Sequence, residues 1–204
     1  MRSFIKQGSV ALILSNIGGF IALMFSTTFF TGMFFWLIGK RGRGKGGGTI
    51  TSLAVSIVLV ALYNKQFTIS EIFLFIMLSF LVAIFCIQIA EQFMLEKWGA
   101  RKRHNGDIVE RDFNETSIDE LHGMLITVLP IYFIKLEFWP FVILHGLALA
   151  AFRVFDVWKP WFIRKVEKGC DQMFGLDIIL DDTAAGFMAM IVTIVGTVVI
   201  KSYL

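Results

Sequence analysis

Acidic and basic side chains gather in one stretch of an otherwise strongly apolar sequence. Arg153, Asp156 and Lys159 follow one another at spacings of three residues, and the stretch ends in the adjacent carboxylates of Asp181 and Asp182. Carboxylate oxygens are ligands that Mg²⁺ prefers in proteins. Arginine and lysine side chains bind phosphate oxygens, arginine through two parallel hydrogen bonds and lysine as a point charge. These residue types therefore indicate chemistry on a phosphate group next to a divalent metal.

A second acidic pair, Asp119 and Glu120, also stands directly before an apolar run. Either pair alone has a structural explanation, because negative charge is favourable in the first turn of a helix and an aspartate can cap it. For Asp119 and Glu120 alone that explanation is the better one. Two such pairs on one predicted face of the protein favour instead oxygen ligands around one or two Mg²⁺ ions.

The basic residues also have a simpler explanation. Arg153 and Asp156 are compatible with an ordinary ion pair on one helix face, which Lys159 shares. Arg164 and the lysines after it are explained by contact with anionic lipid headgroups. The alternative is that Arg153 holds a phosphate, Asp156 orients it or binds metal, and Lys159 adds positive charge.

A glycine-rich run ends at Gly48 and is followed by Thr49 and Ser52. It is compatible with a turn whose backbone N–H groups meet a phosphate at a helix start, although a flexible linker has the same composition. The lysine that a Walker A loop requires is absent from this position. His122 lies close to the first acidic pair, but a lone histidine more often has a structural hydrogen-bonding role.

The whole composition indicates a membrane protein. Hydrophobic residues make up 56% of the 204 residues, and 22 of the residues are Phe. Soluble domains of this size are rarely so apolar, so a multi-span helical bundle is expected. Of the 19 Lys and Arg residues, 14 lie in three polar segments, 40–45, 97–111 and 153–168. The positive-inside rule places such segments in the cytoplasm.

The apolar runs predict the helices that position the polar residues. Thr68 or Ser70 is expected to cap the helix that continues to about Leu95, with Glu71 in its first turn. Pro130 is expected to kink its helix. The predicted apolar segments are Val10–Ile38, which we interpret as a retained segment and not a cleaved signal peptide, then Ile50–Tyr63, the helix ending near Leu95, Leu121–Tyr132, Phe138–Phe152 and Thr183–Ile200.

These segments predict a common face for the polar clusters. If the basic loop Gly39–Gly48 is inside and each apolar segment crosses once, Glu96–Glu120 and Arg153–Asp182 lie inside as well. The N-terminus then begins outside with Arg2 and Lys6, against the positive-inside rule, unless the first segment is a re-entrant hairpin. The predicted fold is an all-α membrane bundle with a polar site on its cytoplasmic face. We expect residues 1–47 to form a hydrophobic segment with a basic loop and residues 48–204 to form the domain that carries the site.

Four motifs in the sequence resemble the phosphatidylglycerophosphatase A family. The third and fourth are specific in this order, and the first is weak alone. The chain departs from the family in keeping only Gly175 of a glycine-rich turn and in having His122 where an apolar residue is usual. The motifs are Gly48-Thr49-x-x-Ser52-Leu53, Asp119-Glu120-x-x-Gly123-Met124, Phe152-Arg153-x-x-Asp156-x-x-Lys159-Pro160-Trp161-x-Ile163-Arg164, and Asp181-Asp182-x-x-Ala185-Gly186.

The resemblance implies a Mg²⁺-dependent phosphatase of the bacterial inner membrane that converts phosphatidylglycerophosphate into phosphatidylglycerol. Its expected partners are this glycerophospholipid and membrane lipid, and no nucleic acid. Carried over to matching positions, the resemblance implies metal ligands at Asp119, Glu120, Asp181 and Asp182. It implies catalytic roles for Asp156, Asp182, Arg153 and Lys159, and substrate binding by Arg164, Thr49 and Ser52.

The expected mechanism is metal-assisted hydrolysis, with Asp156 as candidate general base. A phospho-aspartate intermediate ranks lower, because the sequence lacks an Asp-x-Asp signature. The signatures of histidine-based lipid phosphatases and of CDP-alcohol phosphotransferases are also absent from the sequence. The alternative is a small transporter or channel with intramembrane carboxylates. Against it, the acids cluster at predicted helix ends on one side.

Overall fold

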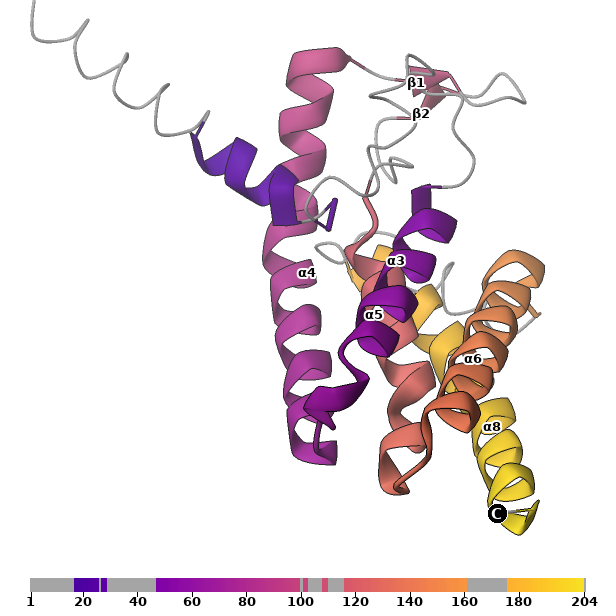
Figure 1. Cartoon of the computed structure of the whole chain (residues 1–204). Coiled ribbons are helices and arrows are strands. Elements are labelled where there is room, and N and C mark those ends of the chain that lie inside the picture. The colour runs from indigo at the N-terminus through magenta and orange to yellow at the C-terminus, as the bar shows by residue number, and fades with distance from the viewer. Residues whose placement is uncertain are drawn as a thin grey trace, which may run out of the picture.

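The computed structural model shows a bundle of helices, which confirms the all-α prediction (Figure 1). The predictions for Arg164, for the basic loop before residue 47 and for most of the first apolar segment concern residues outside those that the structure describes. The described residues are 17–25, 27–28, 47–99, 101–102, 108–109, 116–160 and 176–203.

Three long helices form the outside of the bundle and two shorter ones complete it. In chain order the elements are α3 (Gly47–Ala61), the 3₁₀ helix η1 (Tyr63–Lys65), α4 (Ile69–Trp98), the strands β1 (Arg101–Lys102) and β2 (Ile108–Val109), α5 (Ile118–Val128), the 3₁₀ helix η2 (Leu129–Phe133), α6 (Phe138–Trp158) and α8 (Leu176–Tyr203). Residues 17–25 are also helical, and the two strands pair antiparallel over two residues each.

The long helices have the length and composition of membrane spans. Residues 69–97 of α4, 138–158 of α6 and 179–203 of α8 are each apolar over a length sufficient to cross a bilayer. Their outward side chains are large and hydrophobic, for example Phe85, Ile143 and Val198, which are all exposed. A helix with apolar residues on its outer face is stable in lipid, so these surfaces indicate a membrane protein.

The start of α4 agrees with the sequence prediction. Thr68 is its N-cap: the Thr68 hydroxyl accepts a hydrogen bond from the Glu71 backbone N–H, and the Glu71 carboxylate accepts one from the Thr68 backbone N–H. This reciprocal capping box satisfies two backbone donors that a helix start otherwise leaves without partners.

Pro130 ends an α-helix where the sequence predicted a kink. α5 stops at Val128, and the chain tightens into η2, with the Leu129 N–H bonded to the Ile126 carbonyl three residues back. Proline has no N–H with which to continue the α-helical pattern. The 3₁₀ turn is the result, and it leads into the connection to α6.

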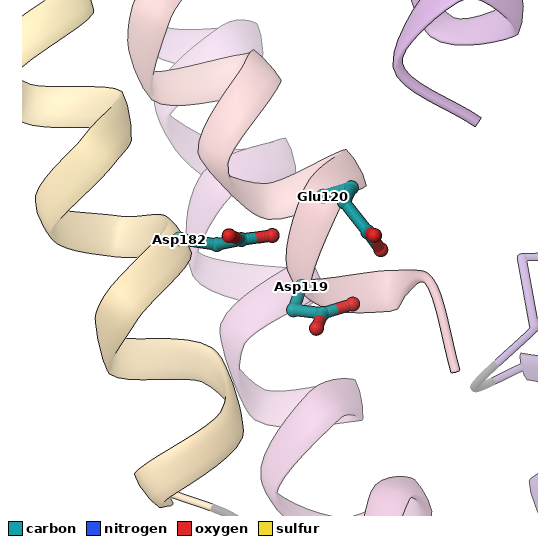
Figure 2. A group of neighbouring side chains, drawn as sticks. All are labelled: Asp119, Glu120 and Asp182. Atoms are coloured by element: carbon teal, nitrogen blue, oxygen red, sulfur yellow. The ribbon is translucent and has the colours of Figure 1, made fainter. Parts of the chain in front are cut away.

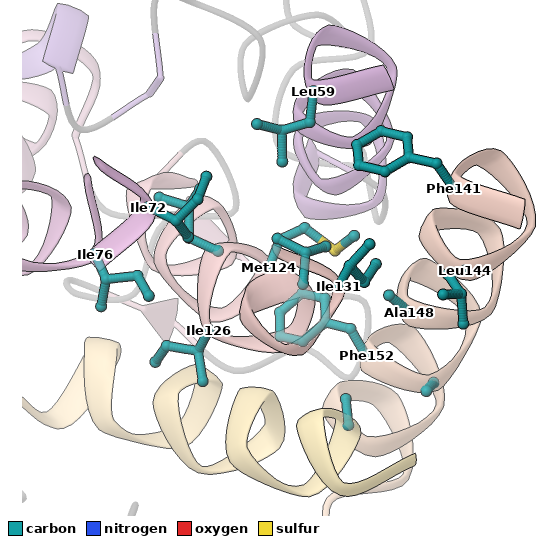
Figure 3. Packing of buried hydrophobic residues seen from close by; sticks show 14 of the residues in the cluster. Leu59, Ile72, Ile76, Met124, Ile126, Ile131, Phe141, Leu144, Ala148 and Phe152 are labelled. Carbon is teal, nitrogen blue, oxygen red and sulfur yellow. The ribbon is translucent and has the colours of Figure 1, made fainter. Parts of the chain in front are cut away.

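The central helix of the bundle is α5. Every residue from His122 to Val128 is buried, and a helix that is buried all round belongs in the core of a bundle. Met124 packs among Leu59 of α3 and Phe152 of α6, as Figure 3 shows. α4 and α8 pack against the same helix, so its position is fixed from several sides.

The charged clusters of the sequence meet at one end of the bundle. α3, α5 and α8 begin at this end, and α4 and α6 finish there (Figure 1). The other end carries η1, the α5–α6 connection and the C-terminal end of α8. The alternating direction of the helices thus places those polar residues of the clusters that the structure describes at one common end.

Candidate active site

The first acidic pair lies where the sequence predicted it. Asp119 and Glu120 occupy the first turn of α5, after the N-cap residue Ser117. The positive end of the helix dipole favours carboxylates there. Because α5 is the central helix, its first turn is surrounded by the other helices and these two acids are largely removed from solvent.

The second acidic pair lies deeper in its helix than predicted. The last helix was predicted to start at Thr183, whereas α8 begins no later than Leu176. The reason is Ile179, which is fully buried and packs with Ala83 and Ile87 of α4. This packing stabilises extra helical turns before the acids, so the interpretation of Asp182 as an N-cap is wrong.

A close crossing of α5 and α8 brings the two pairs together. A Cβ atom on Gly186 would lie 2.7 Å from the backbone oxygen of Gly123, and one on Gly123 would lie 2.7 Å from the backbone oxygen of Asp182. Only glycine permits backbones to approach so closely. The Thr127 hydroxyl donates to the Gly123 carbonyl at 2.8 Å and lies 3.4 Å from the Gly186 carbonyl. A structural role for these two glycines and for Thr127 was not predicted, although the Gly-x-x-x-Thr spacing places Gly123 and Thr127 on one face of α5.

Three carboxylates converge at this crossing. Asp119, Glu120 and Asp182 each place one oxygen within 4.8 Å of the others. Figure 2 shows Asp182 reaching from α8 toward the first turn of α5. Asp119 is only 8% exposed and Asp182 only 4%. One buried acidic cluster therefore forms from two helices, although Asp119 and Asp182 are 63 positions apart in the sequence.

The surroundings of the cluster disfavour ionisation of all its carboxyl groups together. Burial is the main cause that raises the pKa of Glu120 to about 8, and the nearby Asp182 carboxylate is the second cause. Within the described residues, Oε2 of Glu120 is buried and has no hydrogen-bond partner. The other oxygen, Oε1, packs against Gly48 at the start of α3, where a side chain would clash with it. Hard oxygen donors of this kind suit Mg²⁺, so the residues present fit the predicted ion.

Two basic residues flank the acidic cluster. Arg153 forms an ion pair with Asp156 at 2.6 Å, as the three-residue spacing predicted. Lys159 pairs with Asp181 of α8, with Nζ 2.5 Å from Oδ2, a contact that the sequence did not predict. Asp156 also interacts electrostatically with Glu120 and with Asp182 of α8, and Arg153 interacts with Glu120. The predicted catalytic residues are therefore all within one site.

The two predicted substrate-binding residues of α3 differ in their exposure to solvent. Ser52 is buried and its hydroxyl donates to the Gly48 carbonyl at 2.8 Å, while Thr49 is exposed in the first turn of α3. Both lie at the end of the bundle that holds the acids. His122 has the structural role considered for it: Nδ1 hydrogen-bonds to the Ser79 hydroxyl at 2.9 Å, and the ring contacts Phe80.

The fold and the site together define a helical membrane protein with a buried carboxylate cluster beside an arginine and a lysine. Comparison with protein families adds the identification. The family described as phosphatidylglycerophosphatase A matches residues 24–197 of the 204-residue chain, so the chain belongs to this family. Comparisons with curated proteins and with solved structures each gave no match. Membership implies a phosphatase that acts on the phospholipid phosphatidylglycerophosphate.

Proposed function

We propose that the protein is a Mg²⁺-dependent phosphatase of the bacterial inner membrane that hydrolyses the terminal phosphomonoester of phosphatidylglycerophosphate at the cytoplasmic face. One observation carries the proposal: in a chain of this family, Asp119, Glu120 and Asp182 form a buried cluster beside Arg153 and Lys159. The carboxylates of such a site complement a divalent cation, and its arginine and lysine complement a phosphate group.

Asp119, Glu120 and Asp182 would hold the metal. Each contributes one oxygen, and a cation bound where these oxygens converge would explain why a buried group of like charges is tolerated in the fold. A bound Mg²⁺ supplies charge neutralisation at the phosphate and a lowered pKa for water. Oε2 of Glu120, which has no hydrogen-bond partner among the described residues, would be available as a ligand of that ion.

The other charged residues would act on the phosphate and on the attacking water. Arg153 and Lys159 offset the charge that develops on the phosphoryl oxygens. Asp156 is next to the acidic cluster and takes a proton from the water as that oxygen bonds to phosphorus. The bond from phosphorus to the glycerol oxygen breaks, and that oxygen is protonated to the free hydroxyl of phosphatidylglycerol as inorganic phosphate leaves.

The position of the site in the bundle suits a lipid substrate. The acids lie near the ends of α6 and α8, two of the predicted spans, and not halfway along them. The phosphate headgroup of a membrane lipid lies at this depth, so the acyl chains stay in the bilayer while the headgroup enters the site. This placement also argues against the transporter, whose intramembrane carboxylates are expected near the bilayer midplane.

Phosphate release by the purified protein in detergent tests the proposal. We expect release from phosphatidylglycerophosphate with Mg²⁺, loss of release with a chelator and recovery when Mg²⁺ is added back. Phosphatidic acid, which presents a similar phosphomonoester, serves as the comparison that measures headgroup selectivity. Unchanged release in the presence of the chelator would contradict the metal dependence, and no release with any divalent ion would contradict the phosphatase.

A further inference from the structure

We propose that Asp181 is a positioning residue for Lys159 and not a ligand of the metal. In this assignment the Lys159–Asp181 ion pair is a clamp that fixes one phosphate-binding cation between α6 and α8. The inference deepens the proposed function and rests on it. It also revises the sequence prediction that all four residues of the two acidic pairs bind metal.

Each oxygen of Asp181 accepts a hydrogen bond. Oδ2 accepts from the Lys159 ammonium group at 2.5 Å, and Oδ1 accepts from the backbone N–H of Asp182 at 2.9 Å. A carboxylate engaged in this way is held in one orientation by two donors. The cluster whose oxygens lie within 4.8 Å of one another contains Asp182 and does not contain Asp181.

The geometry of α8 separates the two neighbouring acids. Successive residues of an α-helix point about 100° apart, because a turn contains 3.6 residues. Asp182 points toward α5 and joins the acids there (Figure 2), whereas Asp181 reaches the end of α6. Adjacent carboxylates can therefore have different tasks, one beside the metal and one beside the cation.

The backbone conformation at Lys159 is costly for a residue with a side chain. Lys159 is the C-cap of α6 with φ 41° and ψ 76°, in the left-handed region that favours glycine. Residues with a Cβ are strained in this conformation, and such strain is often found at functional sites. The helix ends here, so the lysine side chain leaves α6 and crosses to α8. Its side chain is 30% exposed and that of Asp181 is 13% exposed, which leaves the pair at the rim of the buried acidic cluster.

A double-mutant cycle separates a positioning role from metal ligation. The variants are Lys159→Gln, Asp181→Asn and the double variant, with Asp181→Glu as the conservative replacement. If Asp181 acts through Lys159, each single change lowers kcat/KM by about 100-fold, the size typical for loss of one transition-state donor. The double variant then loses no more than Lys159→Gln alone, and Asp181→Glu recovers part of the activity. A loss of kcat/KM in the double variant equal to the product of the two single losses would contradict the proposal that Asp181 acts through Lys159.

Metal binding provides the second measurement, independent of activity. Calorimetric titration of the detergent-solubilised protein with Mn²⁺ should still detect binding in Asp181→Asn, weakened by no more than about 10–100-fold, the range for residues that support metal ligands without being ligands. Asp182→Asn should bind no Mn²⁺ in the same range. Loss of Mn²⁺ binding in Asp181→Asn would show that this residue is a ligand and would overturn the proposal.

Folding controls keep the result interpretable. Lys159→Gly removes the side chain and also relieves the left-handed backbone, so it should unfold at a temperature close to that of wild type and still lose activity as Lys159→Gln does. Full activity of Lys159→Gly would overturn the clamp. Absence of phosphate release by the wild-type protein would overturn the proposed function itself, a result distinct from multiplied losses in an active enzyme.

Discussion

Asp182→Asn is expected to lower phosphatase kcat/KM by about three orders of magnitude, which corresponds to several kcal/mol of transition-state charge stabilisation. Asp182 is 4% exposed and belongs to the only metal-compatible group of acids among the described residues. Asparagine keeps the size of the side chain and removes its charge. Steady-state kinetics with phosphatidylglycerophosphate measure the effect.

The same variant should not lose stability in the absence of metal. Three buried carboxylates repel one another, so removal of one charge is expected to leave the thermal unfolding temperature equal or higher in chelator. The stabilisation of the wild type by added Mg²⁺ should disappear in the variant. Glu137→Gln is the matched control, because it removes an exposed carboxylate at the start of α6, at the opposite end of the bundle. Equal activity losses in both variants would contradict the assignment of Asp182.

Gly186→Ala is expected to have the second large effect, through the helix crossing. The added methyl group would lie 2.7 Å from the Gly123 carbonyl oxygen, so α8 must move away from α5. Overpacking of this kind destabilises proteins by about 1–3 kcal/mol. The shift also separates Asp182 from Asp119 and Glu120, so we expect Mn²⁺ affinity to fall by at least about tenfold, as for changes in the shell around metal ligands.

Gly146→Ala is the control for the helix-propensity effect of this substitution. A Cβ atom at Gly146 of α6 has no neighbour within 4 Å, so alanine should be tolerated and gain up to about 1 kcal/mol of helix propensity. Thermal unfolding and Mn²⁺ titration of the two variants give the comparison. If Gly186→Ala bound Mn²⁺ as tightly as Gly146→Ala, the crossing would not be what positions the three acids.

The features that the sequence predicted well are local ones. Thr68 and Glu71 form a capping box that needs only residues three apart, and Arg153 and Asp156 pair at the same spacing. The common end of the described polar residues followed from counting apolar segments, because each successive helix reverses the chain direction. In each case the interacting residues are close in sequence or the rule depends on segment order alone.

The features that the sequence did not predict depend on contacts between distant helices. α8 begins earlier than expected because Ile179 is buried against α4, a contact with residues about ninety positions away. The Lys159–Asp181 pair joins residues 22 positions apart, and its geometry depends on the left-handed end of α6. The packing of Glu120 against Gly48 depends on where α3 begins. Helical periodicity describes a face of a helix and does not identify which helix will cover it.

The most direct test of the metal-dependent site is to locate the ion in the protein. An experimental structure with Mn²⁺ in place of Mg²⁺, solved with anomalous diffraction, identifies the ion by its own scattering. The site proposed above predicts an anomalous peak at the α5–α8 crossing, at ligand distance of about 2.0–2.2 Å from oxygens of Asp119, Glu120 and Asp182. A peak held instead by Asp181, or no peak at these acids in a crystal of active enzyme, would contradict the account.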